Sequence, residues 1–234
     1  MRIAAMKHRP SSPVAVPVAP GVLLDSRRAL VHPEQRWLAV ADLHFGYEAR
    51  RRREGALMPD WGMAQGEQTL LDLLADHQPH RLILVGDVMD GVGAVEETLV
   101  LLERLRERIE VVCVEGNHDR VSLRRAGQFL PHWQEGAFWF EHGHRPLNPE
   151  PGRILITGHE HPAVRLADGA GLRLKLPALV QEQLTPDCVR WILPAFSPWA
   201  AGGEYRSPYL RLATWLCAPS RIWPTDREQS QEEA

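Results

Sequence analysis

The chain has 234 residues, with 27 Lys and Arg against 30 Asp and Glu and a formal net charge of −3. This length is ample for a self-sufficient core, and the slightly acidic balance excludes a general electrostatic attraction to nucleic acid. No stretch approaches the roughly 20 apolar residues needed to cross a bilayer, and three scattered cysteines exclude a disulfide framework or a zinc ribbon. We therefore expect a soluble, cytoplasmic protein.

The two ends of the sequence differ in composition from the middle. Residues 1–20 hold four prolines among small residues, and residues 225–234 are polar and acidic, which predicts a flexible N-terminal segment and a disordered acidic tail. The prolines also interrupt the N-terminal apolar run too early for a secretory signal. Between the ends no linker or repeat is visible, so we expect a single domain over residues 21–224.

Short apolar runs alternate with helical patterns through the first half of the chain. Buried strands are predicted at 37–41, 81–85 and 111–115, and leucine spacing predicts helices over 67–77 and 95–108. This order is the parallel crossover pattern. A further strand is predicted at 138–141, and later runs joined by short turns, at 154–157, 163–166, 172–176 and 189–193, favour a second sheet.

Five of the apolar runs stop in acidic, amide or imidazole residues. In chain order the motifs are Asp42-Leu43-His44, Gly86-Asp87, Gly116-Asn117-His118-Asp119, His142-Gly143-His144 and Gly158-His159-Glu160-His161. One such ending is as readily a turn or a helix cap, but five in series are not. Because the carboxyl ends of strands in an α/β sheet converge, these motifs predict one ligand site.

This motif series, which runs from Trp37 to His161, resembles the calcineurin-like metallophosphoesterase superfamily. The flanks at 42–48, 53–55, 158–162 and 193–198 are similar to small prokaryotic members that include the DNA-ligase-associated type. The resemblance implies a four-layer αββα sandwich of two mixed β-sheets flanked by helices. It also implies a phosphoesterase with two divalent metal ions, a role in DNA repair, and a DNA ligase or helicase system as partner.

Phosphoester hydrolysis at neutral pH needs a hydroxide nucleophile and neutralisation of the phosphoryl charge. Two metal ions about 3.5–4 Å apart provide both through a shared water, and a carboxylate must then bridge them. Asp87, alone after Gly86 at a strand end, is the candidate bridge. The family pattern implies that Asp42, His44, Asp87 and His161 bind the first ion and Asp87, Asn117, His142 and His159 the second. Oxygen and imidazole donors favour Mn²⁺, with Fe and Zn²⁺ as alternatives.

Further residues are candidates for contact with substrate. The resemblance places His118 toward substrate, to stabilise the phosphoryl oxygens or to protonate the leaving group, and Asp119 would orient it by accepting the other ring proton. His144 would lie at the mouth of the site, an exposed loop histidine being the alternative. Arg51 and Arg52, within the run 50–53, would contact a phosphate backbone if that helix faces the cleft, and otherwise form a solvated face.

The predicted reaction is hydrolysis of phosphodiester bonds, in nucleotides or nucleic acid, by a metal-bridging hydroxide. Two alternatives stay open: a phosphomonoesterase or nucleotidase, and a catalytically silent scaffold of the same fold. The complete ligand set together with His118 argues against the scaffold. Amidohydrolases also use a His-x-His pair, but they do not explain the motif Gly116-Asn117-His118-Asp119.

Overall fold

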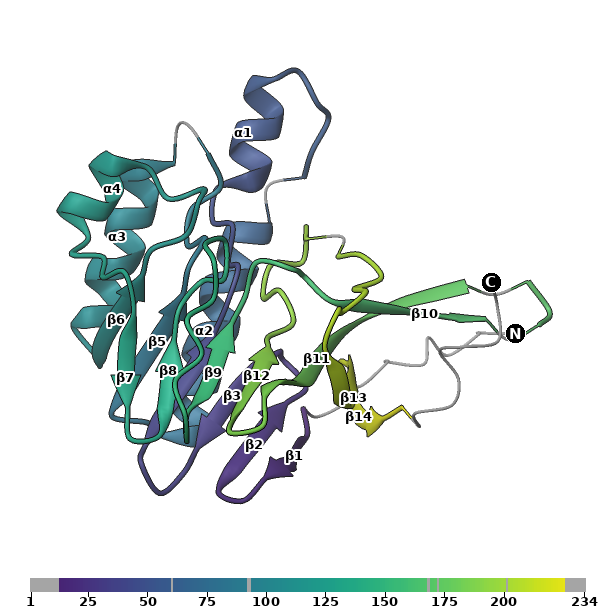
Figure 1. The fold of residues 1–234 in the computed structure, drawn as a ribbon. Coiled ribbons are helices and arrows are strands. Elements are labelled where there is room, and N and C mark those ends of the chain that lie inside the picture. Colours follow the sequence, from purple (N-terminus) through teal and green to yellow (C-terminus); the bar gives the residue numbers. More distant parts are fainter. Residues whose placement is uncertain are drawn as a thin grey trace.

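Two mixed β-sheets packed face to face, with helices on the outer side of the six-stranded sheet, make up the fold (Figure 1). The computed structural model describes residues 13–59, 61–91, 94–167, 169–171, 173–200 and 202–225. The predicted pair of mixed sheets with flanking helices is confirmed.

The six-stranded sheet is built from the first half of the chain. Its strands are β1 (Ala15–Ala19), β2 (Val22–Asp25), β3 (Ala29–His32), β4 (Trp37–Val40), β5 (Arg81–Val85) and β6 (Glu110–Val114), and they neighbour one another in that order. Pairing is antiparallel from β1 to β4 and parallel from β4 to β6. The parallel part is the predicted crossover unit, and its carboxyl ends lie side by side.

The eight-stranded sheet is built from the second half. Its strands are β7 (Trp133–Glu135), β8 (Phe138–Phe140), β9 (Ile154–Thr157), β10 (Ala163–Ala167), β11 (Arg173–Thr185), β12 (Cys188–Ile192), β13 (Leu210–Ala218) and β14 (Arg221–Pro224). They follow the order β14-β13-β11-β12-β9-β8-β7, and β10 pairs with the first part of β11. The strands β8, β9 and β12 are parallel neighbours.

Aromatic side chains fix the two sheets against each other. Trp37 of β4 is fully buried, and its ring meets Phe138 and Phe140 of β8 edge to face, at centroid distances of 5.0 and 5.4 Å. Such edge-to-face contacts add to the stabilisation from buried area. Because β4 leads to Asp42 and β8 leads to His142, this contact also sets the distance between two of the ligand motifs.

Helices α2 (Gly62–His77) and α3 (Val95–Arg106) cover the outer face of the six-stranded sheet. Helix α1 (Tyr47–Arg53) projects beyond the ends of the strands, and α4 (Val121–Ala126) lies beside α3 (Figure 1). Leu73 of α2 and Leu102 of α3 are fully buried with Leu82 of β5 in one apolar cluster, as the leucine spacing predicted. None of the helices in the described ranges is long and apolar enough to cross a membrane.

The layer outside the eight-stranded sheet differs from the prediction. In the described part of the chain no helix follows Ala126, so this half supplies no helical layer of its own. Instead an irregular segment lies there, with the Tyr205 hydroxyl 3.2 Å from a Glu182 carboxylate oxygen and Ser207 bonded to the same carboxylate. The sequence at 194–208 is rich in Pro and Gly, which do not favour a helix.

The N-terminal boundary of the domain lies earlier than residue 21. Residues 15–19 form β1, and Val16 and Val18 pack against the core between the sheets. Pro17 fits there because β1 is an edge strand. The expected flexible segment is therefore wrong for residues 15–19, while residues 1–12 and the tail at 226–234 lie outside the described residues.

Candidate metal centre

The predicted ligand motifs come together at one edge of the two sheets. Asp42 follows β4 and His159 follows β9, yet the His159 amide donates to both carboxylate oxygens of Asp42 at 3.1 Å. Further backbone hydrogen bonds join Asp42 N to Gly86 O and Gly158 N to His142 O. These bonds hold four loops from both sheets in register around one point.

A first cluster consists of Asp42, His44 and His161. The His161 Nε2 atom lies 3.3 Å from Asp42 Oδ1 and 3.3 Å from His44 Nε2. One ligand atom from each residue falls within 4.8 Å of the others, which is a spacing that a single cation can span. This is the side-chain set that was predicted, together with Asp87, for the first metal ion.

A second cluster consists of Asp87, His142 and His159. The His142 Nδ1 group donates to the Val85 carbonyl oxygen at 3.1 Å, which leaves Nε2 as an electron-pair donor. That Nε2 atom is buried without a hydrogen-bond partner in the described chain, and it faces Asp87 Oδ2 at 3.2 Å. Two buried electron-pair donors aimed at each other fit a cation held between them.

The electrostatics of this pair agree with its geometry. Burial by itself would raise the pKa of Asp87, but the charge of a protonated His142 imidazole, with Nε2 3.2 Å away, lowers that pKa to about 2. Burial would lower the pKa of His142, yet Asp87 and Asp42 raise it. The carboxylates therefore favour positive charge at this position, which a bound cation would supply.

Asp87 lies between the two clusters. Its Oδ2 atom is 3.2 Å from His142 Nε2 and 4.0 Å from His44 Nε2, while Oδ1 accepts a hydrogen bond from the His118 amide at 2.9 Å. A Cβ atom at Gly116 would stand 2.1 Å from Oδ1, so only glycine lets the loop after β6 approach this carboxylate. The position is compatible with the predicted bridging role.

The backbone at the clustered ligands is strained. Five of the nine non-glycine residues with positive φ in the described ranges are predicted ligands, namely Asp42, His44, Asp87, His159 and His161, with φ from 44° to 71°. A residue with a Cβ in this left-handed region costs roughly 1–2 kcal/mol. Such strain persists where the surrounding structure enforces it, and functional sites are the usual place.

The loop after β6 brings Asn117 and His118 to the rim. The His118 side chain is 46% exposed, with Nε2 4.0 Å from Asp87 Oδ2 and its ring edge on to His44 at 5.1 Å. It therefore borders both the clusters and the solvent from which substrate arrives. Asn117 is an exposed residue of the same loop, and its role as a ligand stays a prediction.

Asp119 has a different partner from the one predicted. Its carboxylate accepts hydrogen bonds from the Met89 and Gly116 amides, at 3.0 and 2.8 Å, so it fixes the loop backbone. Burial raises the pKa of Asp119 to about 6 against the effect of these two amides. The carboxylate beside the His118 ring is that of Asp90, with Oδ1 3.7 Å from Nδ1.

Asp90 is the site residue that the sequence reasoning missed. Its Oδ1 atom lies 3.4 Å from His44 Nδ1, and its Oδ2 atom accepts from Arg50 Nε at 2.7 Å. The contact between Asp90 and His44 is of the kind by which a carboxylate orients a metal-binding histidine. Burial would raise the pKa of Asp90, but His44 and Arg50 lower it. The signal in the sequence was an acidic residue three positions after Asp87, next to Val88 and Met89.

The predicted substrate residues occupy different surroundings. The His144 ring lies 5.3 Å from that of His142, and burial and the neighbouring His142 lower the pKa of His144. Arg51 pairs with Glu54 at 2.7 Å on α1, and Arg52 is an exposed residue of the same helix. The structure thus puts His144 beside the second cluster, while contact of Arg51 and Arg52 with substrate stays a prediction.

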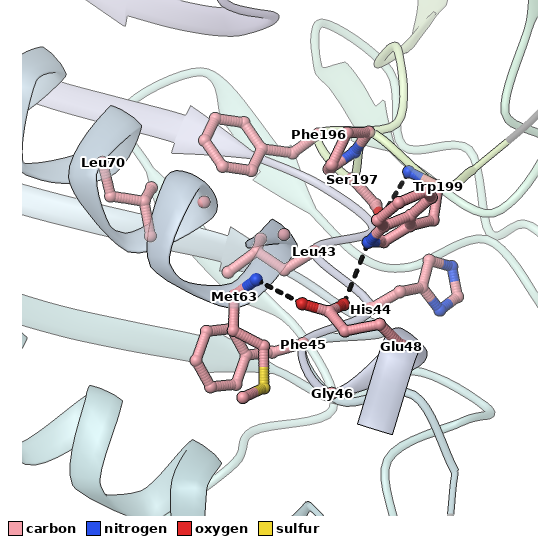
Figure 2. Close-up of a pocket in the computed structure, with 13 residues that line it drawn as sticks. Leu43, His44, Phe45, Gly46, Glu48, Met63, Leu70, Phe196, Ser197 and Trp199 are labelled. Atoms are coloured by element: carbon pink, nitrogen blue, oxygen red, sulfur yellow. Dashed lines mark hydrogen bonds between the residues drawn. The ribbon is translucent and has the colours of Figure 1, made fainter. Parts of the chain in front are cut away.

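A small pocket behind His44 has a structural role (Figure 2). It measures about 20 Å³, which is room for roughly one water molecule. Inside it the buried Glu48 carboxylate accepts from the Met63 amide at 2.6 Å and from Trp199 Nε1 at 2.9 Å. A carboxylate at the first turn of α2 satisfies a free amide and the helix dipole, so Glu48 joins α2 to the 196–199 loop.

Comparison with known proteins adds a family and a set of similar folds. The model of the calcineurin-like phosphoesterase family matches residues 36–172. A comparison with curated proteins finds no match. Among solved structures, the nuclease MPE of Pseudomonas putida is 25% identical with a TM-score of 0.67, covering 92% of this chain and 100% of that one. Yfce, a phosphoesterase from E. coli, is 15% identical with a TM-score of 0.45, covering 77% and 86%.

Proposed function

Because the chain belongs to the calcineurin-like phosphoesterase family, we propose that it is a binuclear metal-dependent phosphodiesterase acting on nucleic acid or nucleotides. The observation that carries the proposal is the pair of adjacent clusters, Asp42 with His44 and His161, and Asp87 with His142 and His159. The similarity to a nuclease along that protein's whole length supports nucleic acid as substrate.

When bound, two divalent cations would supply an acidified water and neutralise the phosphoryl charge. The chain's own residues hold the reacting groups in place. Asp87, facing both clusters, is proposed as the bridging ligand, and Asn117 as a further ligand of the second ion. His118 at the rim is positioned to donate a proton to the leaving oxygen or a hydrogen bond to the phosphoryl group. Asp90 restrains the rings of His44 and His118.

The finer assignments rest on donor type and on the branch resemblance. The oxygen and imidazole donors support manganese, with iron and zinc as alternatives. The three cysteines are buried and form no disulfide, which supports a reducing compartment such as the cytoplasm. A role in DNA repair beside a DNA ligase or helicase is proposed from the branch resemblance alone.

The test is a matrix of metals and substrates. The purified protein is stripped with a chelator, dialysed, and assayed with Mn²⁺, Fe²⁺, Zn²⁺ or Mg²⁺ on bis(4-nitrophenyl) phosphate, 4-nitrophenyl phosphate and DNA. We expect turnover of the diester and of DNA only after a transition metal is restored. Full activity in the stripped protein would overturn the metal mechanism. Preference for the monoester would favour a nucleotidase, and metal binding without any turnover would favour a silent scaffold.

A further inference from the structure

The hairpin of β10 and β11 projects from the domain directly after His161. Residues 163–167 pair with 173–177, whereas the rest of β11 pairs with β12 and β13 inside the sheet. In Figure 1 these two paired segments, drawn in green, extend away from both sheets. We call residues 163–177 the arm. Its first residue is only two positions beyond a predicted metal ligand.

The arm has one basic face and one apolar face. Arg165 is directly opposite Lys175, and Arg173 is opposite Ala167, so all three cations share a face. The other face carries the pairs Val164 with Leu176 and Leu166 with Leu174. The sequence 163–177 contains a single carboxylate, at position 168. Like charges placed directly opposite destabilise a hairpin, and a polyanion bound over them would relieve the repulsion.

The inner end of the basic face lies at a cavity that reaches the candidate metal centre at His161. A cavity of about 210 Å³ is lined by Ala163, Lys175 and Pro177, which all lie on that face, and by the predicted ligand His161. Arg28 lines the same cavity, with its guanidinium donating to the Ala195 and Ser197 carbonyl oxygens. Lys175 donates to the Gly202 carbonyl oxygen at 2.8 Å, which fixes the base of the arm. Positive charge therefore continues from the cavity along the arm.

We propose that the basic face of the arm binds the phosphate backbone of a nucleic-acid strand that leaves the metal centre past His161. This inference rests on the proposed function and adds the direction in which the substrate extends. The five paired positions of the arm span about 17 Å at 3.4 Å per residue. The cations occupy two levels of the arm, Arg165 beside Lys175 and Arg173 two residues further out, which are about 7 Å apart at 3.4 Å per residue. Positive charge spread along the arm in this way suits a repeating phosphate chain rather than one small anion.

Helix α1 is the competing surface for the phosphate backbone. There Arg50 is bonded to Asp90 at 2.7 Å and to Glu54 at 2.8 Å, and Arg51 is bonded to Glu54. These carboxylates neutralise part of the charge of the run. On the arm the three cations share one face, and its sequence holds a single carboxylate, so the arm offers an arrangement that a phosphate chain can follow.

The experiment compares DNA binding with hydrolysis of a small diester in matched variants. The arm variant is Arg165→Gln with Arg173→Gln, which leaves Lys175 and its contact to Gly202 intact. The control is Arg104→Gln with Arg108→Gln, which removes the same charge from exposed positions at the end of α3 and just beyond it. Affinity for labelled single-stranded DNA is measured by fluorescence anisotropy in chelator, over a range of salt concentrations. Turnover of bis(4-nitrophenyl) phosphate is measured with Mn²⁺.

In the arm variant, the slope of log affinity against log salt should become shallower by about 1.4, because each lost phosphate contact on a single strand removes about 0.7. Its turnover of the small diester should stay unchanged, its thermal midpoint should not fall, and the control should keep the original slope. An unchanged slope in the arm variant, an equal change in the control, or no DNA binding by the unmodified chain would overturn the inference. Failure of the proposed function would instead show as no diester turnover in any variant.

Discussion

The Nε2 atom of His142 faces the Oδ2 atom of Asp87 at 3.2 Å, across the junction of the two sheets. His142 follows β8 of the eight-stranded sheet, whereas Asp87 follows β5 of the six-stranded sheet. A cation bound between these two atoms would therefore join the two halves of the fold as well as form part of the proposed centre. Metal loss should consequently lower thermal stability along with activity.

Substitutions at Asp87 and His118 should separate metal binding from chemistry. Asp87→Asn should reduce metal content and abolish turnover, because Asp87 faces both clusters. His118→Ala should keep two metal ions per chain and lower kcat by about 10²–10⁴-fold, the usual contribution of general acid catalysis. Elemental analysis alongside kinetics checks both. The reverse pattern, with metal lost only in His118→Ala, would refute the assignment of roles.

The buried ion pair of Arg190 and Glu182 should be strongly coupled, so that removing one charge destabilises the fold much more than removing both. Arg190 Nε donates to Thr157 Oγ1 at 2.9 Å, and Nη1 lies 3.4 Å from Glu182 Oε1. Arg190→Met leaves the fully buried Glu182 carboxylate with the Tyr205 and Ser207 hydroxyls but without its ion-pair partner, and should destabilise the fold by about 3–5 kcal/mol. The double variant with Glu182→Met should recover most of that loss in urea unfolding. Simple additivity of the two substitutions would contradict this coupling.

The ionised carboxylate of Asp25 should stabilise the fold at neutral pH and lose this effect in acid. Burial favours its neutral form, but hydrogen bonds from Arg27 and His77 lower the pKa of Asp25 from 3.8 to about 2. Because the pKa is lower in the folded chain, the ionised Asp25 carboxylate stabilises the fold by about 2 kcal/mol. This contribution is complete above pH 3.8 and is lost as the pH falls toward 2. Asp25→Asn should lower the free energy of unfolding by that amount at pH 7 and weaken its dependence on pH between about 4 and 2.

Asp76 provides the matched control, because it binds the same Arg27 at 2.7 Å from a position that is 54% exposed. An exposed ion pair contributes little, so Asp76→Asn should cost less than about 1 kcal/mol. Denaturant midpoints measured from pH 2 to pH 7 compare the two variants. Equal losses at both positions would mean that burial of Asp25 is unimportant.

Two glycines of α2 should respond to alanine in opposite directions. A Cβ atom at Gly62 would stand 2.3 Å from Trp199 Nε1 and 2.9 Å from a Glu48 oxygen, whereas Gly66 has nothing within 4 Å. Gly62→Ala should therefore cost about 1–3 kcal/mol through overpacking. Gly66→Ala should gain about 0.5–1 kcal/mol from helix propensity. Thermal melts of the two variants test this prediction. A higher thermal midpoint in both would show that the pocket around Glu48 accommodates the added methyl group.

The strands that carry the site could be predicted because they are buried on both faces. The observed bounds of β4, β5, β6, β8 and β9 lie within one residue of the apolar runs, and Asp42, His44, Asp87, His142, His159 and His161 come together as the motif order indicated. Burial leaves such segments few alternatives to apolar side chains, so their ends are visible in the sequence.

Other features depend on contacts that no local pattern records. Asp90 reaches His44 because its amide donates to the Phe45 carbonyl oxygen, which turns the loop back toward the site. Asp119 bonds to backbone amides that only the folded loop brings near it. The irregular layer over Glu182 likewise depends on long-range partners. In each case a polar residue took its role from tertiary structure rather than from its neighbours in the chain.

The left-handed backbone at five predicted ligands implies a trade-off between activity and the thermal stability of the metal-free chain. Glycine or asparagine at position 161, where φ is 44°, would relieve local strain in the metal-free chain while deleting a donor. Laboratory evolution for heat resistance in the presence of a chelator should therefore accumulate changes at these positions, and its most heat-resistant products should be inactive. Selection that also requires activity should instead yield stabilising substitutions far from the strand ends that carry the ligands.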